Sequence, residues 1–389
     1  MDLSPFFESL NLQEPRLNRT QHQSSWWKQS LIHLEEFPDW RAAEIILIGC
    51  PERRGADRGP NTPDGLEAIR KALYKLVPPI DRPIMADLGN LIPKDSPQET
   101  YDLLGFAIQQ LQEAGKRVLI IGGSQDLTIG QFSACDALQR KVEYVHIDSK
   151  FDLLDPDIAL NNETFNQFLL DQYGHLLLTL TNLGYQRYYT PDSQRQYLRE
   201  LNHYTVRYGD LSGQMAEAEP YLRTADIVSL DMGAIRNSEA PGTDQSGPGG
   251  FSAVEICQMV RYAGIGYRCN SLLISEFDHA LDRGGQTADL IALMIWYFVE
   301  GHCNRKDDYP RPDRSNLRKY SVQLHASIDA IHFFKHPESG RWWMEVPLDP
   351  QLGAKKSPCV IVPCSEKDYQ FAKTDDIPDR WWLTYNKLS

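Results

Sequence analysis

The 389-residue sequence lacks several features that would place it in a special class of protein. No apolar run comes close to the roughly 18 residues that a membrane-crossing helix needs. The N-terminal residues lack the basic and then apolar pattern of a secretory signal peptide, so we do not expect one. No internal repeat and no low-complexity stretch is present. These absences argue against a membrane-spanning, secreted or repeat protein.

Positive charge and paired cysteines are also scarce. Forty basic residues stand against 53 acidic ones, for a net charge of −13. Nucleic acids and anionic membranes select basic surfaces, so we expect neither as a partner. The cysteine count is odd and no Cys-x-x-Cys pair occurs, which indicates reduced thiols in a cytoplasmic protein. The seven cysteines are Cys50, Cys135, Cys257, Cys269, Cys303, Cys359 and Cys364.

Short apolar runs alternate with helical patterns through most of the chain. Such alternation predicts an α/β fold with three αβα layers and a mostly parallel central sheet. Ligands in these folds bind beyond the carboxyl ends of the strands. The expected strands are residues 44–49, 117–121, 142–148, 176–183, 226–231 and 271–275. The expected helices are residues 65–76, 99–114, 127–138, 254–263 and 286–301.

Composition changes at both ends of this pattern. Residues 1–40 are polar but contain Trp26, Trp27 and Trp40, and we interpret them as an N-terminal extension that docks through its aromatic side chains. Residues 41–304 form the expected α/β domain. Residues 305–389 begin with a charged stretch and become rich in aromatic residues, which suggests an irregular C-terminal appendage packed on the core. Within it, Cys359 and Cys364 flank a short apolar run typical of a strand.

Polar residues gather at the ends of four expected strands. The segments are Gly122-Gly123-Ser124-Gln125-Asp126, His146-Ile147-Asp148-Ser149-Lys150-Phe151-Asp152, Ser229-Leu230-Asp231-Met232-Gly233-Ala234-Ile235-Arg236, and the stretch from Ile274 through Glu276 to Asp282. In order and spacing they resemble the motifs of the arginase, agmatinase and formimidoylglutamase (ureohydrolase) family. The loops 55–60 and 249–252 and the stretch 282–290 are also similar to that family, so the resemblance covers residues 43–303.

The resemblance implies an arginase-like fold and a specific chemistry. Family members bind two Mn²⁺ ions that bridge a hydroxide, which attacks a guanidine or amidine carbon. By the same resemblance, Asp148, Asp152 and Asp231 match metal ligands, and Glu276 matches the residue that receives the guanidinium group.

Four positions depart from the family motifs. Gln125 and Lys150 stand where the family has histidines, and Gly233 and Arg236 stand where it has aspartates. Carboxylates without metal ions repel one another, and a fixed cation relieves that repulsion. We therefore expect Lys150 and Arg236 to replace the metal charge, with no cofactor bound. In the alternative, Gln125 and the three aspartates form an all-oxygen set that holds a single Mn²⁺ or Mg²⁺ ion.

Other interpretations of the same residues stay open. The aspartates can be ordinary turn residues, and Lys150 can be a reactive amine with a lowered pKa. We interpret His146 as a core histidine and not as a new ligand. Gly122-Gly123 lacks the Lys and Ser/Thr of a phosphate-binding P-loop.

Two functional hypotheses follow from these departures. The first is an inactive ureohydrolase-like pseudoenzyme with a binding or structural role. Its pocket either takes an amino-acid-like or amidine ligand through Glu276 or is plugged by Lys150 and Arg236. The second is a divergent hydrolase of non-peptide C–N bonds in guanidino or formimino substrates, acting with one metal or none through Lys150 or Glu163. The resemblance also implies a homo-oligomer.

Overall fold

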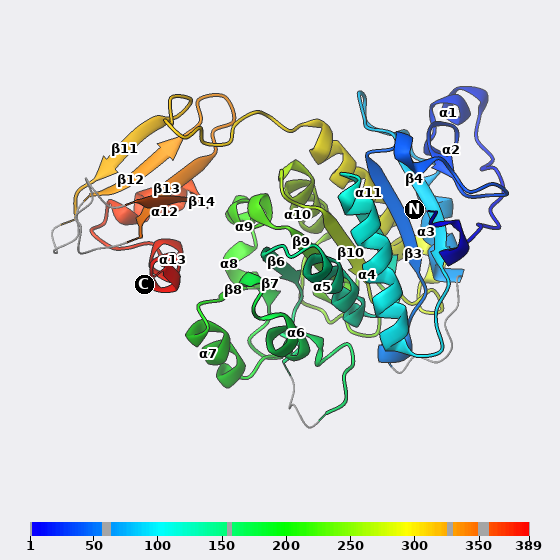
Figure 1. Cartoon of the computed structure of the whole chain (residues 1–389), viewed down its shortest axis with the longest axis horizontal. Coiled ribbons are helices and arrows are strands. Elements are labelled where there is room, and N and C mark those ends of the chain that lie inside the picture. Colours follow the sequence, from blue (N-terminus) through cyan, green and yellow to red (C-terminus); the bar gives the residue numbers. More distant parts are fainter. Residues whose placement is uncertain (1, 57–63, 154–157, 325–329, 349–357, 389) are drawn as a thin grey trace.

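The computed structural model describes residues 2–56, 64–153, 158–324, 330–348 and 358–388 (Figure 1). Its centre is a mostly parallel sheet in the order β1-β4-β3-β5-β10-β9-β6-β7-β8, with β2 beside β4. Only the β1–β4 pair is antiparallel among these described strands. The strands are β1 (Phe7–Glu8), β2 (Leu31–Ile32), β3 (Ile45–Cys50), β4 (Met85–Leu91), β5 (Arg117–Gly122), β6 (Val142–Ile147), β7 (Leu177–Tyr185), β8 (Tyr204–Arg207), β9 (Ile227–Asp231) and β10 (Ser271–Ser275).

Helices cover both faces of this sheet and give the predicted three layers. Helices α4 (Pro97–Glu113), α5 (Thr128–Ala137) and α6 (Phe165–Tyr173) pack on one face. Helices α3 (Asp64–Leu73), α10 (Ala253–Ile265) and α11 (Gln286–Cys303) pack on the other. Each interface buries its own apolar core. The shorter helices of this part are α1 (Arg19–Ser24), α2 (Trp26–Gln29), α7 (Asp192–Glu200), α8 (Tyr208–Leu211) and α9 (Glu219–Thr224).

The strand order explains why the polar motifs meet. Strands β5, β10, β9 and β6 are consecutive neighbours in the sheet, and each is followed directly by one of the four motifs. Parallel neighbours end at the same edge, so the motifs gather on one side of the molecule. Local signals fix the helices that support them. Helix α10 begins with a capping box in which Ser252 and Glu255 bond to each other's backbone amides.

The N-terminal segment joins the sheet through its own short strands. Strands β1 and β2 both pair with β4. Trp26 and Trp40 are buried, and they belong to the cores on opposite faces of the sheet. Aromatic docking of this segment is therefore accompanied by backbone pairing that the sequence did not suggest.

The prediction that the C-terminal appendage is irregular was wrong. This part forms an antiparallel sheet in the order β11-β12-β13-β14, from β11 (Arg318–Val322), β12 (Ile331–Lys335), β13 (Trp342–Pro347) and β14 (Cys359–Cys364). Helices α12 (Glu366–Ala372) and α13 (Asp379–Leu388) follow, and a third apolar core lies between the sheet and these helices. The apolar run between the two cysteines is strand β14, as expected.

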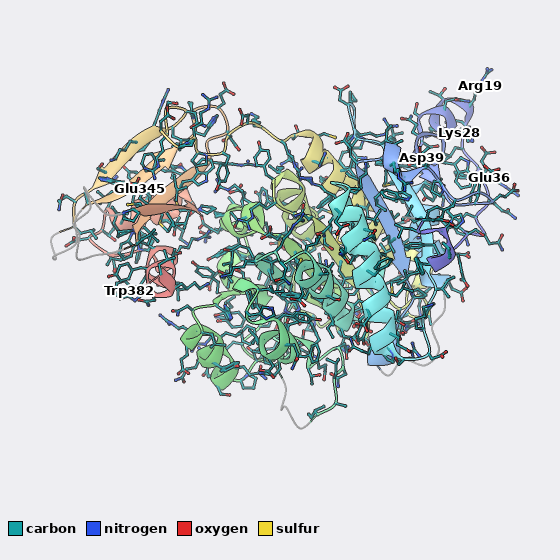
Figure 2. The ribbon with its side chains drawn as sticks, in the orientation of Figure 1. Arg19, Lys28, Glu36, Asp39, Glu345 and Trp382 are labelled. Atoms are coloured by element: carbon teal, nitrogen blue, oxygen red, sulfur yellow. The ribbon has the colours of Figure 1, made fainter. Side chains whose placement is uncertain are left out.

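The C-terminal sheet lies at one end of the molecule, beyond β8 (Figure 1). Figure 2 shows Glu345 and Trp382 at this end and Arg19 and Lys28 at the other. Buried Arg223 of α9 donates to the backbone oxygens of Trp342 and Cys364, at 3.1 and 3.4 Å, and so fastens the sheet to the α/β part.

Two further features bear on the expectations from composition. No helix in the described ranges is both long and apolar enough to cross a membrane. All seven cysteines are free thiols.

Candidate functional site

A small cavity lies at the edge where the motifs meet. Its volume is about 10 Å³, and it lies beyond the carboxyl ends of β6 and β9. A single water needs about 10–15 Å³ of such space, so the cavity has room for one water-sized particle and not for an amino acid. The lining residues are Asp148, Ser149, Lys150, Asp152, Asn162, Glu163, Asp231 and Gln245.

Lys150 closes the mouth of this cavity. Its ammonium group donates to Glu163 Oε1 and to Gln245 Oε1, both at 2.9 Å. Burial by itself would lower the pKa of Lys150, but the ion pair with Glu163 and the charges of Asp152 and Asp148 outweigh that effect and raise the pKa. Lys150 therefore carries a positive charge directly beside the carboxyl groups.

Asp148 and Asp152 form a buried pair of carboxyl groups behind Lys150. Burial raises the pKa of both, and the negative charges of Asp148 and Asp231 raise the pKa of Asp152 further. Asp152 also has a positive φ of 52°, a conformation rare outside glycine. Burial and the neighbouring negative charges thus favour the protonated form of Asp152.

His146 belongs to the same cluster from the sheet side. Its Nε2 atom lies 3.6 Å from Asp148 Oδ2 and 3.4 Å from Asp152 Oδ2, and the three side chains are close enough to share an ion. A metal-bound histidine donates its second N–H to a neighbour. Here the Asn166 amide donates to His146 Nδ1 at 3.0 Å, which leaves the proton on Nε2, facing the aspartates. Burial lowers the pKa of His146 to about 3, so the ring is neutral.

Gln125 does not join the aspartates, and the expected all-oxygen set is not formed. Its Nε2 donates to Ser229 Oγ at 2.5 Å, and its Oε1 accepts the hydroxyl of Ser275. These two serines, on β9 and β10, hold both ends of the amide group. The sequence could not show this arrangement, because a serine in a strand gives no indication of its hydrogen-bond partner.

Glu276 is close to Gln125 but does not line the cavity. It is fully buried, with a positive φ of 65°. Its Oε1 accepts from the Gln125 backbone amide at 2.7 Å and from Asn162 Nδ2 at 3.2 Å. The carboxylate thus ties three loops together.

The prediction that Arg236 adds a second cation to the aspartates was wrong. Its guanidinium group donates to the Tyr208 hydroxyl and to the Gly250 backbone oxygen, both at 3.3 Å, and lies 3.7 Å from Glu255. Glu255 lies in the first turn of α10, where it is part of the capping box. This acidic turn holds the guanidinium group of Arg236 away from the aspartates.

Gln245 is the functional residue that the sequence did not reveal. It accepts from Lys150 and fills the space beside Gly233. A Cβ atom at position 233 would lie 2.8 Å from Gln245 Cβ and 2.9 Å from Asp231 Oδ1. Only a residue without a side chain fits between them. The sequence of the loop 241–250 has no pattern that shows which of its side chains point into the site. The contacts of Gln245 could therefore not be predicted.

Comparison with known proteins agrees with this architecture. The fold and the edge site define a ureohydrolase-type α/β protein. The chain belongs to the Arginase family, whose sequence profile matches residues 43–300. The loop 55–60, which is similar to that family, lies mostly outside the described residues.

Its sequence relatives include two kinds of hydrolase. A formimidoylglutamase of Geobacillus thermodenitrificans is 26% identical over 271 residues, which cover 65% of this chain and 82% of that protein. A guanidinopropionase of Pseudomonas aeruginosa is 26% identical over 300 residues, which cover 69% of this chain and 89% of that protein.

Solved structures show the same fold. The formimidoylglutamase of Bacillus subtilis superposes with a TM-score of 0.65 at 18% identity, over 77% of this chain and 98% of that one. A formiminoglutamase of Trypanosoma cruzi with Mn²⁺ gives a TM-score of 0.62 at 20% identity, over 68% of this chain and 95% of that one.

Proposed function

We propose that this chain is a catalytically inactive member of the Arginase family with a binding or structural role. The observation that carries the proposal is Lys150, which lines the same cavity as Asp148 and Asp152 and whose ammonium group is held by Glu163 and Gln245. A protonated amine supplies the positive charge that metal ions would otherwise bring to these carboxyl groups. It has no lone pair with which to coordinate a metal.

The residues at the other family positions do not fit a pair of manganese ions. Each ion needs several oxygen or nitrogen ligands. Gly233 has no donor atom, and both ends of the Gln125 amide are bonded to serines. Burial favours the protonated forms of Asp148 and Asp152, and a bound ion would have to displace those protons. We therefore expect no stable manganese pair.

The volume of the cavity supports the same proposal. An amidine or amino-acid-like ligand does not fit in about 10 Å³. A binding role would therefore use another surface or a second copy of the chain. A homo-oligomer is part of this proposal, and its mass in solution can be measured by light scattering.

Metal content and turnover test the proposal together. The full chain is incubated with Mn²⁺, desalted and analysed by elemental mass spectrometry. It is then assayed with N-formimino-L-glutamate and 3-guanidinopropionate, and the Bacillus subtilis formimidoylglutamase serves as the active control. We expect near-zero manganese and rates equal to the buffer blank. Turnover of either substrate would refute the proposal, and so would one or two tightly held ions per chain.

A second candidate function rests on the His146–Asp148–Asp152 cluster. If the His146 proton moved from Nε2 to Nδ1 and the Asn166 amide turned to accept it, these three ligand atoms could hold one Mn²⁺ or Mg²⁺ ion in a divergent hydrolase of non-peptide C–N bonds, with Lys150 or Glu163 moving a proton. This candidate predicts about one ion per chain and turnover that both His146→Asn and Glu163→Gln reduce. Metal uptake without turnover would leave only a binding role.

A further inference from the structure

The largest cavity described lies far from the family site, between the α/β part and the C-terminal sheet. Its volume is about 580 Å³, inside the range of roughly 300–1,000 Å³ that is usual for small-molecule sites. Strands β6 and β7 form its floor, α9 forms one wall, and β14 and α13 form its roof. Both the family fold and the added C-terminal part therefore contribute residues to it.

One end of the cavity carries the ammonium group of Lys387. This lysine of α13 donates to Thr179 Oγ1 at 2.5 Å and to the Leu178 backbone oxygen at 3.1 Å, which are both uncharged acceptors. Burial lowers the pKa of Lys387 to about 8, and the negative charge of Glu143 opposes that shift. Arg380 pairs with Asp368 at 3.5 Å. Within the described residues, the hydrogen bonds of Lys387 therefore go to uncharged groups.

The lining mixes polar and apolar residues, and partly exposed leucines are among the apolar ones. Leu178, Leu201 and Leu388 line the cavity and are 40%, 42% and 38% exposed. Large apolar side chains left exposed around an opening are typical of binding sites. Deeper inside, Val145 and Val362 face the same space.

We propose that this cavity binds a small amphipathic organic anion. Its carboxylate or similar group would bond to Lys387, and its aliphatic or aromatic body would lie among Val145, Val362 and the leucines of the mouth. An anion would give Lys387 a charged hydrogen-bond partner, whereas its acceptors among the described residues are uncharged, and a hydrogen bond between opposite charges is among the stronger ones.

The site is independent of the proposed function. Glu143, at its floor, lies near the amino end of β6, whereas Asp148 follows the carboxyl end of the same strand. The two positions are five steps apart along the strand, which is roughly 16 Å. Because both parts of the protein form the cavity walls, a bound anion would also hold the C-terminal sheet against the α/β part.

Fluorescence with 8-anilinonaphthalene-1-sulfonate, an aromatic anion, tests the proposal on the full chain. We expect saturable binding of one probe per chain, displaced by 4-phenylbutyrate but not by the uncharged 4-phenylbutanol. Lys387→Met should weaken probe binding roughly 10-fold or more, because it removes a charged hydrogen bond. Lys373→Met is the matched control, since Lys373 lies on the same C-terminal part but does not line the cavity. It should bind as the unchanged protein does.

A second variant separates loss of binding from loss of folding. Val362→Trp fills the cavity from β14 and should abolish binding while the circular dichroism spectrum is kept. Equal binding by the unchanged protein, Lys387→Met and Val362→Trp would overturn the proposal. Equal displacement by the acid and the alcohol would also overturn it. Neither outcome depends on manganese or on hydrolase activity.

Discussion

Position 150 shows how far one residue can be interpreted from sequence alone. The motif identified Lys150 as a cation beside aspartates, and Lys150 lines the same cavity as Asp148, Asp152 and Asp231. Its partners Glu163 and Gln245 come from two loops that carry no periodic pattern. Arg236 lies in an equally clear motif but points to α10. A motif thus predicts where a backbone position lies, and packing decides where a long side chain points.

The four departures from the family motifs can be reversed. The variant Gln125→His, Lys150→His, Gly233→Asp and Arg236→Asp should gain some affinity for Mn²⁺, because it restores four potential ligands. A side chain at position 233 meets Gln245 Cβ at 2.8 Å, so adding Gln245→Gly, which removes that Cβ atom, should increase the uptake further. Manganese per chain is measured after desalting.

Gln245→Gly alone is the control for this series, and it should bind no more manganese than the unchanged protein. It removes the obstruction but adds no ligand. If the variant with all five substitutions folds and still takes up no manganese, the assignment of these residues to the family positions is wrong.

At the scale of elements, β4 shows why some strands escape prediction. Its sequence includes Asp87 and Asn90, which argue against a buried strand, yet both are buried. Arg70 of α3 donates to Asp87 at 2.7 and 3.0 Å and to Asn90 at 2.7 Å. Hydrogen bonds from a distant helix make the polar strand stable. A pattern of apolar residues along one segment contains no information about such a partner.

The attachment of the C-terminal sheet depends on Arg223. The change Arg223→Met removes its bonds to Trp342 and Cys364, its 3.2 Å ion pair with Glu219 and its position 4.5 Å over the Trp343 ring. Unpaired buried acceptors are costly, so we expect a loss of about 2–4 kcal/mol in the free energy of unfolding. Urea unfolding measures this loss.

Limited proteolysis near residues 305–318, the segment before β11, should speed up in the same variant, because the sheet is less firmly held. Arg318→Met is the matched control, since Arg318 lies on β11 with an exposed side chain. A free energy of unfolding for Arg223→Met within about 0.5 kcal/mol of the control would show that this arginine does not fasten the sheet.

At the scale of the whole molecule, the three αβα layers could be predicted from the sequence, but the sheet of the C-terminal part could not. Strands buried on both faces are continuous apolar runs, as in β3, where every residue is buried. The C-terminal sheet is different, because only part of each strand is buried. Strand β11, for example, has one buried residue among five. Its sequence therefore looks like a polar loop, and its pairing depends on strands that are distant along the chain.

Acid stability is a property of the whole chain that its buried histidines help to set. Burial lowers the pKa of His146, His203 and His302 to about 3 in the folded protein. Their pKa in an unfolded chain is near 6.5. Between these values the unfolded state binds more protons, so the free energy of unfolding falls as the pH falls. The buried aspartates Asp148 and Asp152, with raised pKa values, act in the opposite direction above about pH 4.

A comparison with one histidine removed isolates the histidine effect, because the aspartates are the same in both proteins. From pH 7 to pH 5, the unchanged protein should lose about 2 kcal/mol more stability than His203→Gln, which has no proton to gain on unfolding. Urea unfolding at the two pH values gives the difference. His175→Gln is the control, because the His175 side chain is 62% exposed, and it should lose as much as the unchanged protein. Equal losses in all three proteins would mean that His203 takes up its proton while the protein is still folded, and that its surroundings are open to water.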